Sequence, residues 1–178
     1  MKAVTVDEAL HLWNEVLETQ HHRMESVAVS AAKGSVLAED IVASTDVPAF
    51  HKSAMDGYAL AYDPNCGEYI IDGIIGAGVV WDTPVTTGHA VRIMTGAPVP
   101  ETCDTVIMQE QAQGSGEIGS RITIQGTQQK GSHIIPRGEE CLAGTVVIPK
   151  GTEVTSAVQT ILTGLGYIDV SVYAMPRI

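Results

Sequence analysis

Two stretches of the chain place apolar residues at helical spacing, one near each end. The first predicts a helix over residues 5–19, whose apolar stripe comprises Val6, Ala9, Leu10, Trp13, Val16 and Leu17. Thr5 followed by Glu8 has the spacing of a capping box, which fixes the start of this helix. The second stretch predicts a helix over residues 155–165, with apolar positions at Val158, Ile161, Leu162 and Leu165.

Between the helices, short apolar runs alternate with turn signals and predict strands. The chain holds 18 Gly and 8 Pro, and turns this regular are typical of a small β-barrel or sandwich. Residues 114–120 are expected to form a hairpin tip. Residues 73–78 are expected to form a glycine-kinked strand, because GxxGxG is not the spacing of a nucleotide-binding loop. The expected strands are residues 26–29, 36–42, 69–75, 90–94, 105–109, 121–124, 145–148 and 168–172.

This order of elements predicts a mixed α+β, β-rich fold class. Residues 1–46 and 137–178 are expected to form one discontinuous α/β domain that includes the N-terminal helix. Residues 47–136 are expected to form an inserted all-β, barrel-like domain.

Composition and charge narrow the classes of function. The net charge of −11 argues against nucleic acid or an anionic membrane as a partner, since both require a basic face. It also conflicts with the anionic substrates that are common in metabolism. No apolar run is long enough to span a membrane. The 3 cysteines lack CxxC spacing and the 6 histidines lack ligand spacing, which favours free thiols, a cytoplasmic location and no zinc.

Three segments combine polar side chains with glycine in a way that could form a binding or catalytic site. Asp56-Gly57 offers a carboxylate where a ligand can approach the backbone closely. Thr95-Gly96 offers a hydroxyl and an open amide for an oxyanion. Glu139-Glu140 offers oxygens for a hard cation such as Mg²⁺. Taken alone, each segment is more often structural, as a turn, a strand exit or a solvated acidic turn.

Taken in order, the same segments resemble the signatures of one family. Residues 53–59 read SAMDGYA, residues 92–100 read RIMTGAPVP, residues 104–110 read DTVIMQE, and residues 130–140 read KGSHIIPRGEE. They are similar to motifs of the molybdopterin molybdenumtransferase family, MoeA, which also includes the E domain of gephyrin. The likeness is collinear from about residue 5 to the C-terminus.

The chain departs from the family pattern at two places. Glu140 stands where the family usually has Asp, which keeps the carboxylate and lengthens its reach. His133-Ile134-Ile135 stands where the family has Asn-Ile-Arg, so an imidazole replaces the amide and the basic side chain is replaced by an apolar one. Family members continue into a third, doubly wound α/β domain that holds the main pterin pocket. The sequence is therefore expected to be the first two domains of a longer enzyme.

The resemblance implies a function in molybdenum cofactor biosynthesis, namely a Mg²⁺-dependent transferase that inserts molybdate into adenylated molybdopterin. It implies a homodimer whose active cleft takes one wall from this part of the chain, and molybdopterin adenylyltransferase as a candidate partner. Most of the basic groups that bind the substrate are expected outside this chain, which alone should bind it poorly. The alternative is a non-catalytic dimeric scaffold of the gephyrin type.

The same resemblance assigns roles to individual residues. Asp56, Thr95 and Glu140 are expected to be catalytic, and Asp56 and Glu140 are also expected to hold Mg²⁺. A second set is expected to bind substrate: Ser53, Gly57, Gly96, Arg92 and Arg137.

Overall fold

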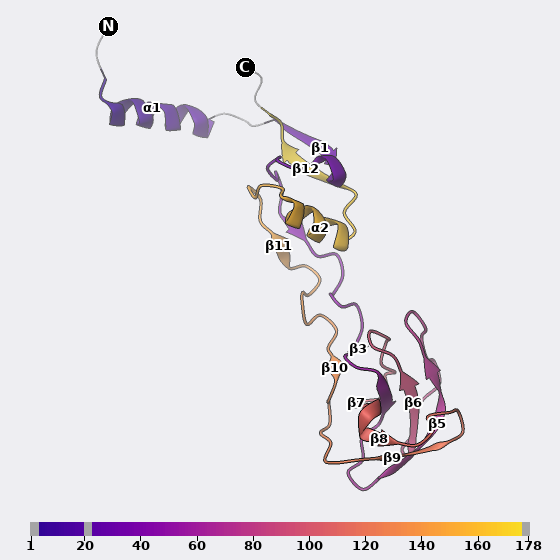
Figure 1. Ribbon diagram of the computed structural model, residues 1–178. Helices are drawn as coiled ribbons and strands as arrows, with labels where there is room; N and C mark the ends of the chain where they lie inside the picture. The colour runs from indigo at the N-terminus through magenta and orange to yellow at the C-terminus, as the bar shows by residue number, and fades with distance from the viewer. Residues whose placement is uncertain (1–3, 20–22, 176–178) are drawn as a thin grey trace. The chain divides into compact units, whose positions relative to one another are not determined.

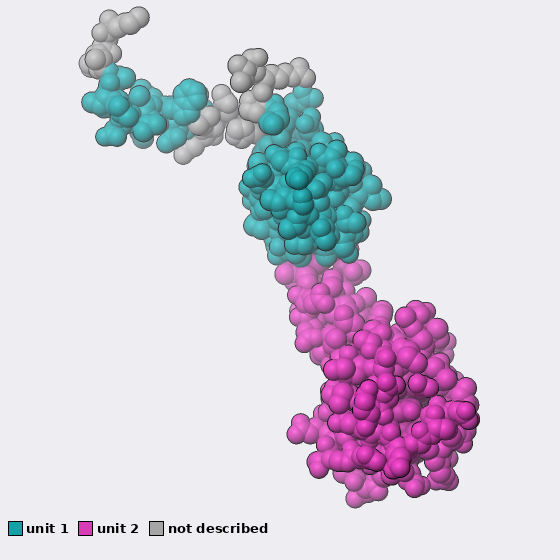
Figure 2. Space-filling view, in the orientation of Figure 1, with its two compact units in different colours: residues 1–42, 146–178 teal, residues 43–145 magenta. Residues whose placement is uncertain are grey.

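The computed structural model describes residues 4–19 and 23–175, and the chain divides into two compact units. Unit 1 combines residues 1–42 with residues 146–178, and unit 2 is residues 43–145 (Figure 2). The fold is β-rich with two α-helices, which confirms the predicted fold class.

Unit 1 joins segments from both ends of the chain. Strand β1 (Met24–Ala28) pairs antiparallel with β12 (Asp169–Tyr173), and β2 (Ile41–Val42) pairs antiparallel with β11 (Val146–Ile148). Helix α2 (Ser156–Gly164) packs beside the 3₁₀ turn η1 (Val29–Ala31) (Figure 1). Their shared core is aliphatic and includes Val29, Leu37, Ile41, Val154, Leu162 and Val172.

Both predicted helices are present, and both begin as their sequences predict. Helix α1 (Val6–Thr19) starts with the expected capping box, in which Thr5 N donates to Glu8 Oε2 at 2.8 Å and Glu8 N donates to Thr5 Oγ1 at 3.3 Å. Helix α2 is capped by the Thr155 hydroxyl, which accepts from Val158 N.

The apolar stripe of α1 lies exposed in the described part of the chain. Val6, Leu10, Trp13 and Val16 are each more than half exposed, and the side chain of Leu17 lies outside the described residues. None of the described helices is long and apolar enough to cross a membrane.

Unit 2 is built on a curled six-stranded sheet with the strand order β7-β4-β6-β5-β9-β8 (Figure 1). Every neighbouring pair is antiparallel except the parallel pair β5–β6. A short additional pair, β3 (Lys52–Ser53) with β10 (Ile134–Ile135), leads into this sheet. The six strands are β4 (Gly57–Leu60), β5 (Glu68–Ile75), β6 (His89–Ile93), β7 (Thr105–Met108), β8 (Ala112–Gln113) and β9 (Arg121–Ile124).

The central strands of this sheet are buried on both faces. On β4, Ala59 packs into one hydrophobic cluster, while Tyr58 and Leu60 pack into another. All four residues of β4 are therefore buried, and the strand lacks the apolar–polar alternation that marks a half-exposed strand. This is why the sequence pattern missed β4, whose Asp-Gly start resembles a turn.

Other local predictions have mixed outcomes. The hairpin tip over residues 114–120 is confirmed, since it joins the antiparallel strands β8 and β9. The kinked strand expected over residues 73–78 is present only in part, because β5 ends at Ile75 and its register shift lies between Ile71 and Gly73. The strand expected over residues 36–42 is too long: Val36 and Leu37 make isolated bridges to Glu153 and Val172, and the regular strand is Ile41–Val42.

Unit 2 extends further at both edges than the expected inserted domain. Residues 43–46 and 137–145 cluster with unit 2, whereas the sequence assigned them to the discontinuous domain. The cause is a local pairing of these two segments. Val47 N donates to Cys141 O at 2.8 Å, and Arg137 Nε donates to the Asp46 carboxylate.

Gly57 is required by the close approach of β7 to β4. A Cβ at this position would lie 1.9 Å from the Ile107 carbonyl oxygen, whereas a Cβ at Gly67 would meet nothing within 4 Å. We therefore expect Gly57→Ala to lower the free energy of unfolding by at least about 2 kcal/mol, because the backbone of the central strands must shift. Gly67→Ala is the matched control. Urea denaturation of both variants checks this, and equal stabilities would contradict it.

Candidate functional site

Asp56 and Thr95, which lie 39 positions apart in sequence, meet at one edge of the sheet. Asp56 directly precedes β4 and Thr95 closely follows β6. Because β4 and β6 are antiparallel with Gly57 opposite Ile93, the start of one strand lies beside the end of the other. Asp56 Oδ1 accepts hydrogen bonds from Thr95 N and Thr95 Oγ1, each at 2.7 Å.

Backbone hydrogen bonds around Ser53 hold the two loops together. Ser53 N donates to Ala97 O at 3.0 Å, and Gly96 N donates to Ser53 O at 2.8 Å. The Ser53 side chain is 1% exposed, and its hydroxyl donates to Met55 O at 2.6 Å within its own loop. Ser53, which the sequence predicts to bind substrate, is thus buried and stabilises the loop that carries Asp56.

The hydrogen bonds at Asp56 favour its ionised form. The backbone N–H and the hydroxyl of Thr95 lower the pKa of this carboxyl, and the positive charge of Arg92 lowers it further. Within the described residues, no hydrogen bond uses Asp56 Oδ2. The site therefore presents an exposed carboxylate with one oxygen fixed by Thr95 and the other available to a ligand.

The expectation of an open amide at Gly96 is wrong. Its N–H already donates to Ser53 O, and both donors of Thr95 are directed at Asp56. Gly96 instead contributes its backbone conformation, since its φ of 79° is one that other residues rarely adopt. Gly57 lies within β4 and is buried, so it too serves the sheet directly.

Arg137 and Glu140 are held by other partners in unit 2. The Arg137 guanidinium donates to Asp46, and its backbone N–H donates to His51 Nδ1 at 3.1 Å. Glu140 lies 3.7 Å from Lys52 Nζ. In residues 4–19 and 23–175, no hydrogen bond or ion pair connects Glu140 or Arg137 to Asp56 or Thr95. The predicted catalytic residues therefore form one pair and one separate carboxylate.

Sequence reasoning missed three residues that fix this second group: Asp46, His51 and Lys52. Lys52 directly precedes the SAMDGYA motif and could have been suspected from that position. Asp46 carries no such signal, because an acidic residue before Val-Pro is ordinary loop sequence. The structure gives Asp46 its role: Ala143 N and Arg137 hydrogen-bond to its carboxylate, and both bonds lower its pKa.

The described residues fit a shared Mg²⁺ site only in part. They contain no group of three or more His, Cys, Asp or Glu side chains placed to hold a metal ion. Mg²⁺ at phosphate-transfer sites, however, uses one or two carboxylates and takes its remaining ligands from water and substrate. The available oxygen of Asp56 fits that mode, whereas Glu140 is paired with Lys52.

Comparisons with known proteins place the chain in a family of cofactor-biosynthesis proteins. The family model described as "MoeA N-terminal region (domain I and II)" matches residues 4–166. The chain therefore belongs to the MoeA family and carries its N-terminal region.

Curated relatives and solved structures agree with this assignment. The chain is 34% identical to a molybdopterin molybdenumtransferase of Staphylococcus epidermidis over 89% of its length, and 38% identical to one of Staphylococcus aureus over 86%. A structure of the molybdopterin biosynthesis moeA protein from Pyrococcus horikoshii matches 98% of the chain with a TM-score of 0.78 and 34% identity. A second structure of a moeA protein from this source has a TM-score of 0.82 and 26% identity, also over 98% of the chain.

The chain spans 39% and 38% of the two Staphylococcus relatives, and 46% and 45% of the two structures. The shared part is thus less than half of each known protein.

Thr95→Val should raise the pKa of the Asp56 carboxyl toward its usual value. The hydroxyl donor is lost, while the backbone N–H of Thr95 still donates. The pKa of Asp56 is lower in the folded than in the unfolded protein, so the ionised carboxylate stabilises the fold at pH values above the unfolded-state pKa. This stabilisation is lost as the pH falls through the folded-state pKa. Carboxyl ¹³C NMR titration measures the shift. Thr87→Val, at an exposed loop position, is the control, and an unchanged Asp56 pKa in Thr95→Val would contradict the assignment.

His133 adopts a backbone conformation that suits asparagine better. Its φ is 58°, the only described non-glycine residue with a positive value, and its carbonyl accepts from Ala54 N in the Asp56 loop. Asparagine is enriched in this region, and the family motif has Asn there. His133→Asn should therefore stabilise the protein by up to about 1 kcal/mol. Thermal unfolding of this variant beside His89→Asn checks it, and a lower midpoint than wild type would contradict it.

Proposed function

We propose that the chain is the N-terminal part of a molybdopterin molybdenumtransferase, which inserts molybdate into adenylated molybdopterin. The curated relatives carry this name, and the chain covers their N-terminal region. The observation that carries the proposal is the Asp56–Thr95 pair, an exposed and ionised carboxylate fixed at the edge of unit 2. This pair forms one wall of the active cleft, and the remainder of the protein and a second subunit supply the others.

The residues at this wall act by positioning and electrostatics. Asp56 accepts hydrogen bonds from a water molecule or holds a cation through Oδ2, and Thr95 holds Oδ1 in place. Ser53, Gly57 and Gly96 shape the two loops that carry this pair. Thr95 Oγ1 is engaged with Asp56 and no base accepts its proton among the described contacts, so the pair is assigned a positioning role.

Mg²⁺ fits this wall through Asp56, with the phosphate oxygens of the substrate as further ligands. When bound, the ion neutralises negative charge that develops on the phosphate. Glu140 joins the site only if it leaves Lys52, and Arg137 only if it leaves Asp46. Both changes require reorganisation within residues 43–145.

The same proposal accounts for the unfavourable charge of the chain. Its net charge of −11 repels an anionic substrate, and Arg92 is the basic side chain whose charge acts on Asp56. The chain alone is therefore expected to bind the substrate poorly. The proposal includes a homodimer, a cytoplasmic location and an encounter with the adenylyltransferase that supplies the substrate.

Asp56→Asn in the complete protein should reduce molybdenum cofactor formation about a hundredfold or more. The substitution keeps the shape of the side chain but removes the charge that positions the cation. The assay measures cofactor formed from adenylated molybdopterin, molybdate and Mg²⁺, with circular dichroism to verify folding.

The matched control is Glu117→Gln, which removes a carboxylate from the exposed hairpin tip of the same unit. It should retain activity within about twofold of wild type, since a single exposed surface charge contributes little. Wild-type activity in Asp56→Asn would contradict the catalytic assignment and favour a non-catalytic scaffold.

A further inference from the structure

A cavity lies in unit 2, and neither Asp56 nor Thr95 lines it. Its volume is about 380 Å³, and residues 80–84 and 98–102 form its two walls. Cavities that hold small molecules have volumes of this order. The walls are fixed to each other, because Val85 N donates to Thr102 Oγ1 at 2.9 Å. The second wall includes the prolines at the end of the RIMTGAPVP segment, a part of the motif to which the proposed function assigns no contact with substrate.

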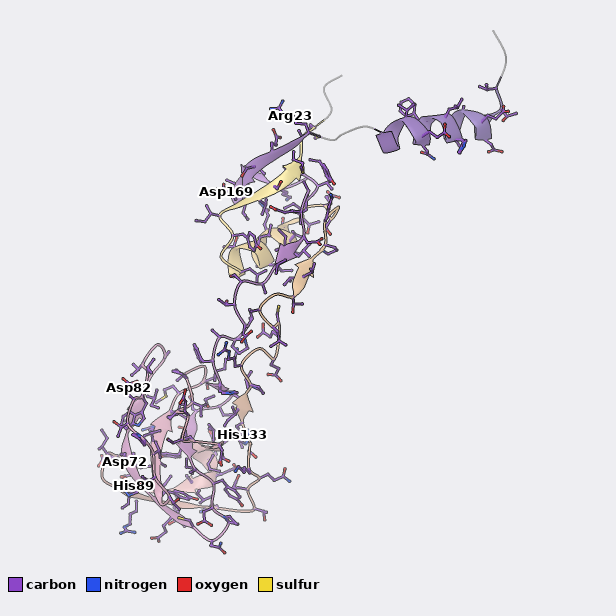
Figure 3. The ribbon with its side chains drawn as sticks, turned by 180° about the vertical axis from the view of Figure 1, so that it is seen from behind. Arg23, Asp72, Asp82, His89, His133 and Asp169 are labelled. Carbon is purple, nitrogen blue, oxygen red and sulfur yellow. The ribbon has the colours of Figure 1, made fainter. Side chains whose placement is uncertain are left out.

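The charges lining this cavity are all negative. Asp82 and Glu101 are its only ionisable lining residues, and both are exposed. Within the described chain, neither carboxylate has a hydrogen bond or an ion pair. Figure 3 shows Asp82 at the rim of unit 2. Two like charges at a small cavity with apolar walls attract a cation and repel the anionic substrate of the proposed function.

Trp81 adds an aromatic ring to the same cavity. The ring is fixed against β5, where a Cβ at Gly73 would lie 2.3 Å from Trp81 Cη2. Its Nε1 is buried and has no hydrogen-bond partner in the described structure. Because this nitrogen is buried, the cavity offers a ligand the indole ring and the two carboxylates rather than the indole N–H.

We propose that this cavity binds a small organic ammonium ion. Tryptophan is the aromatic side chain that attracts ammonium groups most strongly, and carboxylates at the rim add charge attraction. The proline and valine side chains of the two walls contact the alkyl groups of such an ion.

Tryptophan fluorescence tests the proposal with choline as the probe. The chain has 2 tryptophans, so Trp13→Phe leaves Trp81 as the only one. Choline chloride is titrated to about 50 mM at constant ionic strength. Its uncharged isostere 3,3-dimethylbutan-1-ol isolates the contribution of the charge. We expect saturable binding of choline in the millimolar range, and binding of the alcohol that is at least about fivefold weaker.

Carboxylate variants locate the binding site. Asp82→Asn and Glu101→Gln should each weaken choline binding by about three- to tenfold, whereas Glu117→Gln should change it by less than twofold. Circular dichroism verifies that each variant is folded. Any one of three results would overturn the proposal. These are equal affinity for choline and the alcohol, unchanged choline binding in the double variant Asp82→Asn/Glu101→Gln, and no choline binding by about 50 mM. None of these results bears on Asp56, so the two proposals fail independently.

Discussion

The organisation of unit 2 depends on the contact between the backbones of β4 and β7 at Gly57. The strands approach so closely that the Ile107 carbonyl oxygen occupies the space a side chain would need. This approach allows Gln109 N to donate to Asp56 O at 3.1 Å, which ties the residue before β4 to the end of β7. On the other side, the pairing of β4 with β6 brings Asp56 to Thr95. The candidate site is thus a direct consequence of strand packing.

Uncharged hydrogen-bond donors are the main reason that the pKa of Asp56 is low. An amide and a hydroxyl from one threonine lower the pKa of Asp56, and the charge of Arg92 adds to their effect. A carboxylate held in this way stays ionised without a tight salt bridge, so its second oxygen is available for a cation or water. In an acidic chain, such a group requires a positive ion before it can approach an anionic substrate.

Much of this fold is predictable from local sequence signals, while the site is predictable only in part. Thr5 and Glu8 predict the start of α1, and the apolar periodicity predicts both helices. Strand β4 gives no such signal because both of its faces are buried, and its Asp-Gly start resembles a turn. The motifs identify Asp56 and Thr95, but their hydrogen bond depends on strand pairing between distant segments. The links of Glu140 to Lys52 and of Arg137 to Asp46 depend on the same long-range geometry.

The proposed role of Asp56, which is to hold a divalent cation against the reacting phosphate, is tested by the place where that ion binds. Anomalous diffraction from Mn²⁺, in crystals of the complete protein with adenylated molybdopterin, locates that ion directly. The account predicts an anomalous peak within about 2–2.5 Å of Asp56 Oδ2, at the distance of a coordinated oxygen. A peak coordinated entirely by other carboxylates, with Asp56 facing solvent, would contradict it.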